Sequence, residues 1–108
     1  MSSTRQLAAI MFTDIVGYTA LMGNNEQRAF ELLRKNREIQ KPIIEEFGGR
    51  VIKELGDGMM VTFPAVSNAV YAAIKIQEAC YNSKAFELRI GIHQVKWSLR
   101  MTTFLEMQ

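Results

Sequence analysis

Residues 48–63, GGRVIKELGDGMMVTF, consist of two short apolar runs on either side of the sequence GDG. Each run has the length of a β-strand, and glycines in the connecting turn let the chain reverse direction between them. This stretch therefore predicts a β-hairpin, with strands at residues 50–55 and 59–63. The segments before and after the hairpin decide to which fold it belongs.

The chain before the hairpin contains a strand followed by a helix. Residues 7–12 form a continuous apolar run, which is the pattern of a strand that is covered on both faces. Asn24 and Asn25 are suitable helix caps, and apolar residues then recur at helical spacing between residues 29 and 47. We therefore expect a buried strand and a long helix ahead of the hairpin.

The chain after the hairpin supplies a second helix and a fourth strand. Residues 66–79 carry apolar side chains at helical spacing, and residues 86–92 alternate between apolar and other residues, as a strand does. The complete order is β-α-β-β-α-β. This order predicts an α+β, ferredoxin-like fold, in which one antiparallel sheet carries its helices on one face.

The composition is that of one ordinary globular domain. The chain has 108 residues, of which 48% are hydrophobic and 22% are charged, and its net charge is +2. No dense basic block marks a nucleic-acid-binding surface, so we expect no nucleic acid partner. The first apolar stretch is too short to span a bilayer, and the single Cys80 suits a reducing compartment. We therefore expect a cytoplasmic domain without a membrane segment.

Two aspartates are expected at one end of the predicted sheet. Asp14 follows the first strand and Asp57 lies in the hairpin turn, and the first two strands run in the same direction. Their carboxylates and the backbone carbonyl of Ile15 would suit hard divalent cations. Each aspartate also has a structural explanation, because Asp57 is a common turn residue and Asp14 can cap the following helix.

The residues after Asp14 are suited to binding phosphates. Gly17, Tyr18 and Thr19 can present unpaired backbone amides at the start of a helix, where anions are stabilised. Carboxylates, cations and amides together are typical of phosphoryl chemistry on a nucleoside triphosphate.

Three blocks of the sequence resemble one family. AAIMFTDIVGYTALM at residues 8–22, GGRVIKELGDGMMVTF at residues 48–63 and LRIGIH at residues 88–93 resemble the class III nucleotidyl cyclases in content, order and spacing. The resemblance implies a ferredoxin-like core and a head-to-tail homodimer with active sites at the interface. It also implies conversion of a nucleoside triphosphate to a 3′,5′-cyclic nucleotide and pyrophosphate.

The resemblance gives roles to particular residues. Asp14 and Asp57 match the family's two metal-binding aspartates, which hold two Mg²⁺ or Mn²⁺ ions, and Ile15 matches a backbone contact to metal. The segment from Gly17 to Thr19 falls where the family contacts phosphates. Lys53 matches the lysine that reads the adenine base, so ATP rather than GTP is the expected substrate. Without the resemblance, Lys53 would be read as an ordinary solvated lysine of a strand.

The sequence departs from the family after His93. The family continues with Gly-Glu-Val, an Asp-Val-Phe-Gly-Asp stretch, and later an asparagine and an arginine that orient the ribose and stabilise the transition state. Residues 94–108, QVKWSLRMTTFLEMQ, contain no counterpart of these. We therefore expect this polypeptide to be inactive or nearly so.

The genetic code offers an explanation for this tail. Suppose that the coding DNA of this tail is read one nucleotide earlier, so that each new codon begins with the last base of the codon before it. Trp97, Met101 and Met107 each have a single codon, which ends in G, so the three new codons that take these bases must begin with G. Such a shifted reading can spell GEVVFENDDVFGDA, which agrees with the family's continuation. We therefore expect a truncated, incomplete cyclase core at residues 1–93 and a frameshifted tail at residues 94–108.

Two other classes of function stay open at this point. The chain can be a non-catalytic partner that binds nucleotide or regulates a full-length cyclase as a dimerisation partner. It can also be another two-metal ferredoxin-like enzyme, such as a diguanylate cyclase. The hairpin KELGDGMM, residues 53–60, argues against the latter because it has no paired acids of the GGDEF type.

Overall fold

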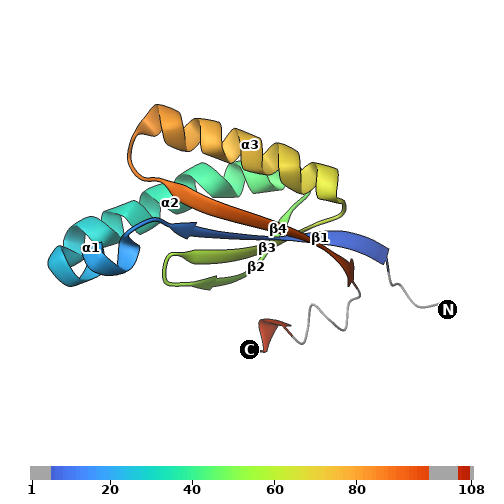
Figure 1. The fold of residues 1–108 in the computed structure, drawn as a ribbon, viewed down its shortest axis with the longest axis horizontal. Helices are drawn as coiled ribbons and strands as arrows, with labels where there is room; N and C mark the ends of the chain where they lie inside the picture. Colours follow the sequence, from blue (N-terminus) through green and yellow to red (C-terminus); the bar gives the residue numbers. More distant parts are fainter. Residues whose placement is uncertain (1–5, 98–104, 108) are drawn as a thin grey trace.

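The computed structural model describes residues 6–97 and 105–107 and contains one four-stranded antiparallel sheet (Figure 1). Along the chain the elements are β1 (Gln6–Ile15), α1 (Tyr18–Asn24), α2 (Glu26–Glu46), β2 (Arg50–Leu55), β3 (Gly58–Phe63), α3 (Val66–Ser83) and β4 (Leu88–Trp97). The strand order is β2-β3-β1-β4, and α2 and α3 lie on one side of the sheet. The predicted ferredoxin-like fold is confirmed.

Several element boundaries differ from the prediction. A short helix, α1, precedes the long helix, and Asn25 between them caps α2 by accepting a hydrogen bond from the backbone amide of Arg28 at 3.1 Å. The last strand begins at Leu88 and continues to Trp97, because it pairs with β1 along the whole of that strand. The strand therefore crosses residue 93 and takes residues 94–97 into the sheet, while residues 98–104 and 108 of the tail lie outside the described part.

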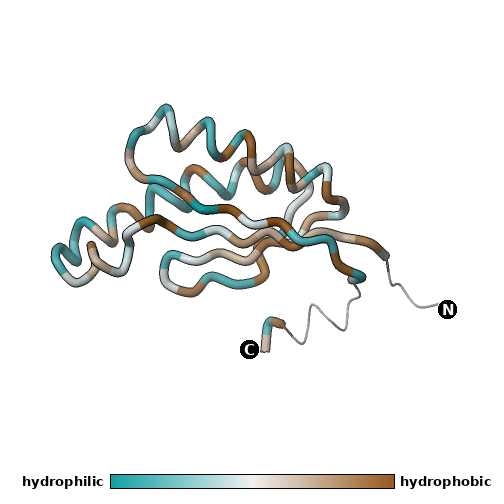
Figure 2. The backbone as a smooth tube through the Cα atoms, viewed as in Figure 1, coloured by the Kyte–Doolittle hydropathy of each residue, from teal (hydrophilic) through white to brown (hydrophobic). Residues whose placement is uncertain are grey.

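The core lies between the sheet and the helices. Residues of β1 alternate between the two faces of the sheet, and Ala9, Met11 and Ile15 are buried against the helices. Hydrophobic and hydrophilic stretches alternate along α3 in Figure 2, as a helix with one buried face requires. Burial of each large apolar side chain stabilises the fold by roughly 1.5–3 kcal/mol. In the described part of the chain, no helix is both long and apolar enough to cross a membrane.

Polar side chains interrupt the apolar face of α2. Asn36 and Gln40 occupy inward positions of this helix and are only 3% and 0% exposed. Gln40 donates a hydrogen bond of 3.1 Å to the Thr13 hydroxyl and one of 2.7 Å to the Asn36 carbonyl oxygen. The three side chains satisfy one another, and they join α2 to β1 at the residue just before Asp14.

Candidate functional site

The hairpin turn is attached to the end of β1. Asp57 follows Gly56, whose positive φ of 57° suits a glycine in a tight turn. An Asp57 carboxylate oxygen, Oδ2, accepts a hydrogen bond of 2.7 Å from the backbone amide of Ile15. The structure thus places the Asp57 carboxylate beside the residue that follows Asp14, although the two aspartates are distant in sequence.

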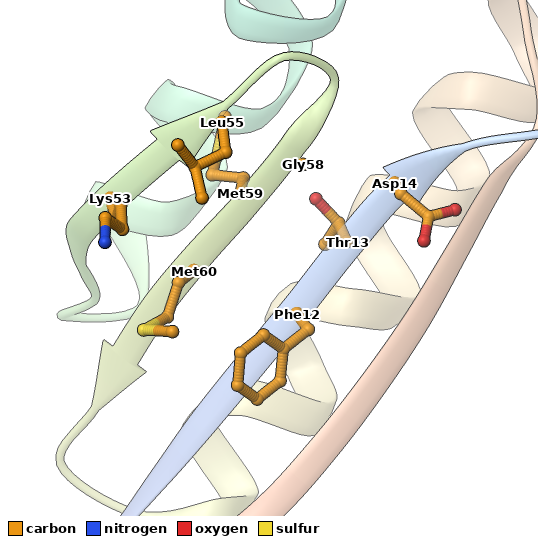
Figure 3. Close-up of a pocket in the computed structure, with 8 residues that line it drawn as sticks. All are labelled: Phe12, Thr13, Asp14, Lys53, Leu55, Gly58, Met59 and Met60. Atoms are coloured by element: carbon orange, nitrogen blue, oxygen red, sulfur yellow. The ribbon is translucent and has the colours of Figure 1, made fainter. Parts of the chain in front are cut away.

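The Asp14 carboxylate has a different partner. Arg89 is directly opposite Asp14 in the pairing of β4 with β1, and its Nε donates a hydrogen bond of 2.8 Å to Asp14 Oδ1. Both side chains are well exposed, at 45% for Asp14 and 71% for Arg89. Figure 3 shows the carboxylate turned toward β4 and away from the hairpin. Sequence reasoning missed Arg89, because only the register of two strands reveals that it faces Asp14.

A pocket of about 270 Å³ lies next to Asp14. Phe12, Met60 and Lys53 are successive cross-strand partners on β1, β3 and β2, so they share the face of the sheet that is turned away from the helices, the distal face. The pocket is lined by Phe12, Thr13, Asp14, Lys53, Leu55, Gly58, Met59 and Met60 (Figure 3). Lys53 and Asp14, which the sequence singles out, therefore border one mostly apolar pocket, whereas Asp57 and Ile15 are not part of its lining.

The predicted phosphate-binding residues lie at the start of α1. Gly17 has a positive φ of 76° and precedes the helix, which begins at Tyr18. The first amides of a helix have no partner within it and carry its positive dipole end. The Tyr18 ring is buried, with its hydroxyl 3.8 Å from the Met22 sulfur, so the backbone rather than this side chain is available for an anion.

Charged residues hold β2 against α2 close to Lys53. Glu54 accepts a hydrogen bond of 2.9 Å from Arg37 Nε and lies 3.3 Å from the ammonium of Lys41. Burial raises the pKa of the Glu54 carboxyl, but the hydrogen bonds and charges of the two cations outweigh it and hold the pKa below its usual value. Glu54 is therefore ionised at neutral pH and keeps the strand that carries Lys53 next to the helix.

The sequence matches the family described as "Adenylate and Guanylate cyclase catalytic domain" over residues 1–101. The chain belongs to this family. Over 100 residues it is 36% identical to "Putative adenylate cyclase 3" from Rhizobium meliloti, a match that covers 85% of this chain and 17% of that protein.

Solved structures show the same fold. The adenylate/guanylate cyclase/hydrolase from Silicibacter pomeroyi is 31% identical, with a TM-score of 0.76 over 88% of this chain and 60% of that chain. The guanylate cyclase domain of RhGC from Catenaria anguillulae, in complex with GTP, is 18% identical, with a TM-score of 0.74 over 84% of this chain and 57% of that chain. The present chain thus spans less than two thirds of the length of each of these cyclases and of the Rhizobium protein.

Asp14 and Asp57 supply two carboxylates at the end of β1 and in the neighbouring hairpin turn, and carboxylates are oxygen ligands for divalent cations. In residues 6–97 and 105–107, no group of three or more His, Cys, Asp and Glu side chains is gathered as a self-sufficient metal site. Mg²⁺ does not need one, because it keeps several waters and commonly binds one or two carboxylates together with substrate phosphates. Asp14 and Asp57 are carboxylates of the kind that such an ion binds; in this structure the Asp57 carboxylate is turned toward the Ile15 amide and that of Asp14 toward Arg89.

Proposed function

We propose that this chain forms the metal- and nucleotide-binding part of a cyclase active site that converts ATP to 3′,5′-cyclic AMP and pyrophosphate. The observation that carries the proposal is the 2.7 Å hydrogen bond from the Ile15 amide to Asp57. This bond joins two blocks of the family's sequence at one strand end, next to the pocket that Asp14 and Lys53 border.

The metal-binding residues of the proposal are Asp14, Asp57 and the backbone of Ile15. Two Mg²⁺ or Mn²⁺ ions held there would neutralise the triphosphate and favour ionisation of the ribose 3′-hydroxyl. The Ile15 amide orients the Asp57 carboxylate through their hydrogen bond. The cross-strand position of Asp14 fixes its backbone within the sheet.

The nucleotide would lie along the distal face and the start of α1. The backbone amides of Gly17, Tyr18 and Thr19 would bind phosphate oxygens, because a helix start stabilises negative charge. The apolar side chains of Phe12 and Met60 would contact the base, and Lys53 would donate to its polar edge. ATP is the proposed nucleotide because Lys53 corresponds to the adenine-reading lysine of the cyclase resemblance.

The proposed working state is a homodimer in the cytoplasm. The pocket opens on the distal face, which leaves room for a second subunit to complete it. Cys80, the single cysteine of the chain, is buried, and a chain with one cysteine is compatible with a reducing compartment.

Binding of Mn²⁺ tests the proposed metal site directly. Electron paramagnetic resonance measures the binding of Mn²⁺. We expect the wild-type chain to bind the ion, and we expect Asp14→Asn and Asp57→Asn each to weaken binding by about tenfold or more. Glu46→Gln is a matched control. It also removes one negative charge, but Glu46 pairs with Lys75 on the helices, away from the proposed site. Equal Mn²⁺ affinity in all of these chains would refute the proposed metal site.

Turnover separates an enzyme from a regulatory partner. We propose that the 108-residue polypeptide makes little cyclic AMP, because residues 94–108 contain no asparagine or arginine that match the family's transition-state residues. Loss of one such stabilising group typically slows an enzyme by about 10²–10³-fold. Cyclic AMP formation that Asp14→Asn abolishes would contradict this. A change in the rate of an intact relative on mixing would instead indicate a regulatory subunit.

A further inference from the structure

The two carboxylates of the proposed metal site are held in different ways. Asp57 accepts a hydrogen bond from a neutral backbone amide, that of Ile15, at 2.7 Å. Asp14 accepts its hydrogen bond from a cation, the guanidinium of Arg89, at 2.8 Å. Across the part of the chain that the structure describes, no cationic side chain forms an ion pair with Asp57. Of the two aspartates, Asp14 is therefore the one whose carboxylate has a cationic partner.

The position of Arg89 follows from the strand register. Arg89 is directly opposite Asp14, and side chains that face each other across antiparallel strands are close neighbours. The next residue on the same face of β4 is Gly91, opposite Phe12, and it has no side chain to reach the site. Arg89 is thus the β4 side chain that approaches Asp14, whose carboxylate is turned toward this strand in Figure 3.

A bound guanidinium and a divalent cation compete for the same carboxylate. The Arg89 hydrogen bond occupies one oxygen of Asp14, and a metal ion on this carboxylate would lie close to a second positive charge. The Coulomb repulsion between charges of +1 and +2 at about 5 Å in water is reduced by physiological salt. The remaining repulsion would raise the Kd for the metal ion by roughly threefold to tenfold. The high exposure of the Arg89 side chain, 71%, lets it move away and keeps the effect in this range.

We propose that Arg89 is a positioning residue that occupies Asp14 before metal binds and lowers the affinity of the site for free divalent cations. The inference rests on the proposed role of Asp14 as a metal ligand. In this arrangement Arg89 holds the carboxylate in the metal-free chain and is displaced from it when the ion binds.

Mn²⁺ titrations of Arg89 variants test the proposal. We expect Arg89→Gln to bind Mn²⁺ roughly threefold to tenfold more tightly than the wild-type chain, and Arg89→Lys to lie between them, because lysine keeps the charge without the planar guanidinium. Arg50→Gln is the matched control: Arg50 is an exposed arginine that pairs with Glu106 and lies at the other end of β2 from the hairpin turn. Its affinity should equal that of the wild-type chain.

A spectroscopic measurement on the unaltered chain gives a second readout. The Nε–H resonance of Arg89 in nitrogen-15 NMR should shift when diamagnetic Mg²⁺ is added, since its hydrogen bond to Asp14 is lost. The proposal is refuted if this resonance is unmoved at saturating Mg²⁺, or if Arg89→Gln binds Mn²⁺ no more tightly than the wild-type chain while Asp14→Asn still weakens binding. The second of these outcomes would leave the proposed metal site intact. If neither the wild-type chain nor Arg89→Gln binds Mn²⁺, the metal site and the inference fall together.

Discussion

The buried hydroxyl of Thr13 connects the core to the strand end that carries Asp14. Thr13 and Gln40 are 3% and 0% exposed, and the Gln40 amide donates to the hydroxyl at 3.1 Å. Thr13→Val keeps the shape of the side chain but leaves the Gln40 amide without this partner. A buried polar group without a partner costs about 1–3 kcal/mol, so we expect the free energy of unfolding to fall by about that amount.

A double-mutant cycle isolates the contribution of this pair. Gln40→Leu alone should also destabilise the chain, because it leaves Thr13 and Asn36 without their bonds to Gln40. The double variant should lose less stability than the sum of the single variants, by about 1 kcal/mol, because neither partner is then left unpaired. Urea unfolding followed by far-ultraviolet circular dichroism measures all four chains. Single and double effects that add within about 0.5 kcal/mol would refute the reasoning.

Three further predictions concern packing, acid stability and base recognition. Gly49→Ala should destabilise the fold by about 1–3 kcal/mol in urea unfolding, because a Cβ there would lie 2.5 Å from a ring carbon of Phe63. Glu54→Gln should lower stability at pH 7 by roughly 0.5–1.5 kcal/mol through the loss of two partly exposed ion pairs. The two cations hold the folded-state pKa of Glu54 below its usual value, so this difference should be fully present above the usual glutamate pKa and be lost as the pH falls through the lowered one. Lys53→Met should reduce the ratio of ATP affinity to GTP affinity in calorimetric titrations with Mn²⁺, because Lys53 borders the proposed base pocket.

Each of these predictions has a matched comparison. Gly23→Ala adds the same methyl group where no atom lies within 4 Å, so it should stabilise α1 by roughly 0.5–1 kcal/mol. Glu46→Gln removes an exposed ion pair with Lys75 that lies away from β2, and Lys84→Met removes a lysine outside the pocket. Unchanged stability in Gly49→Ala, a pH-independent effect in Glu54→Gln, or equal base preference in Lys53→Met and Lys84→Met would each contradict the corresponding prediction.

The hairpin and the strand before it were readable in the sequence, because local patterns set them. The residues 50–55 predicted as a strand are those of β2, and the GDG turn places Asp57 where a turn residue was expected. The C-terminal end of β4 was harder to predict from the sequence. The apolar residues fall at even positions from 86 to 92 but at odd positions from 94 to 97, so the pattern does not continue, and residues 94–97 extend the strand because β1 offers them a partner along its whole length. The frameshift origin of residues 94–108 stays a prediction, which the coding DNA would test.

Sequence alone determined the order of the strands and of the two long helices, the family blocks and the two aspartates, since periodicity and short motifs are local properties of a chain. Tertiary structure decided which groups those aspartates contact. Arg89 reaches Asp14 only through the register of β4 on β1, and Gln40 reaches Thr13 only because α2 lies across the sheet. Such contacts join residues far apart in the chain, and a single sequence carries no local signal for the pairing of strands or the packing of a helix that creates them.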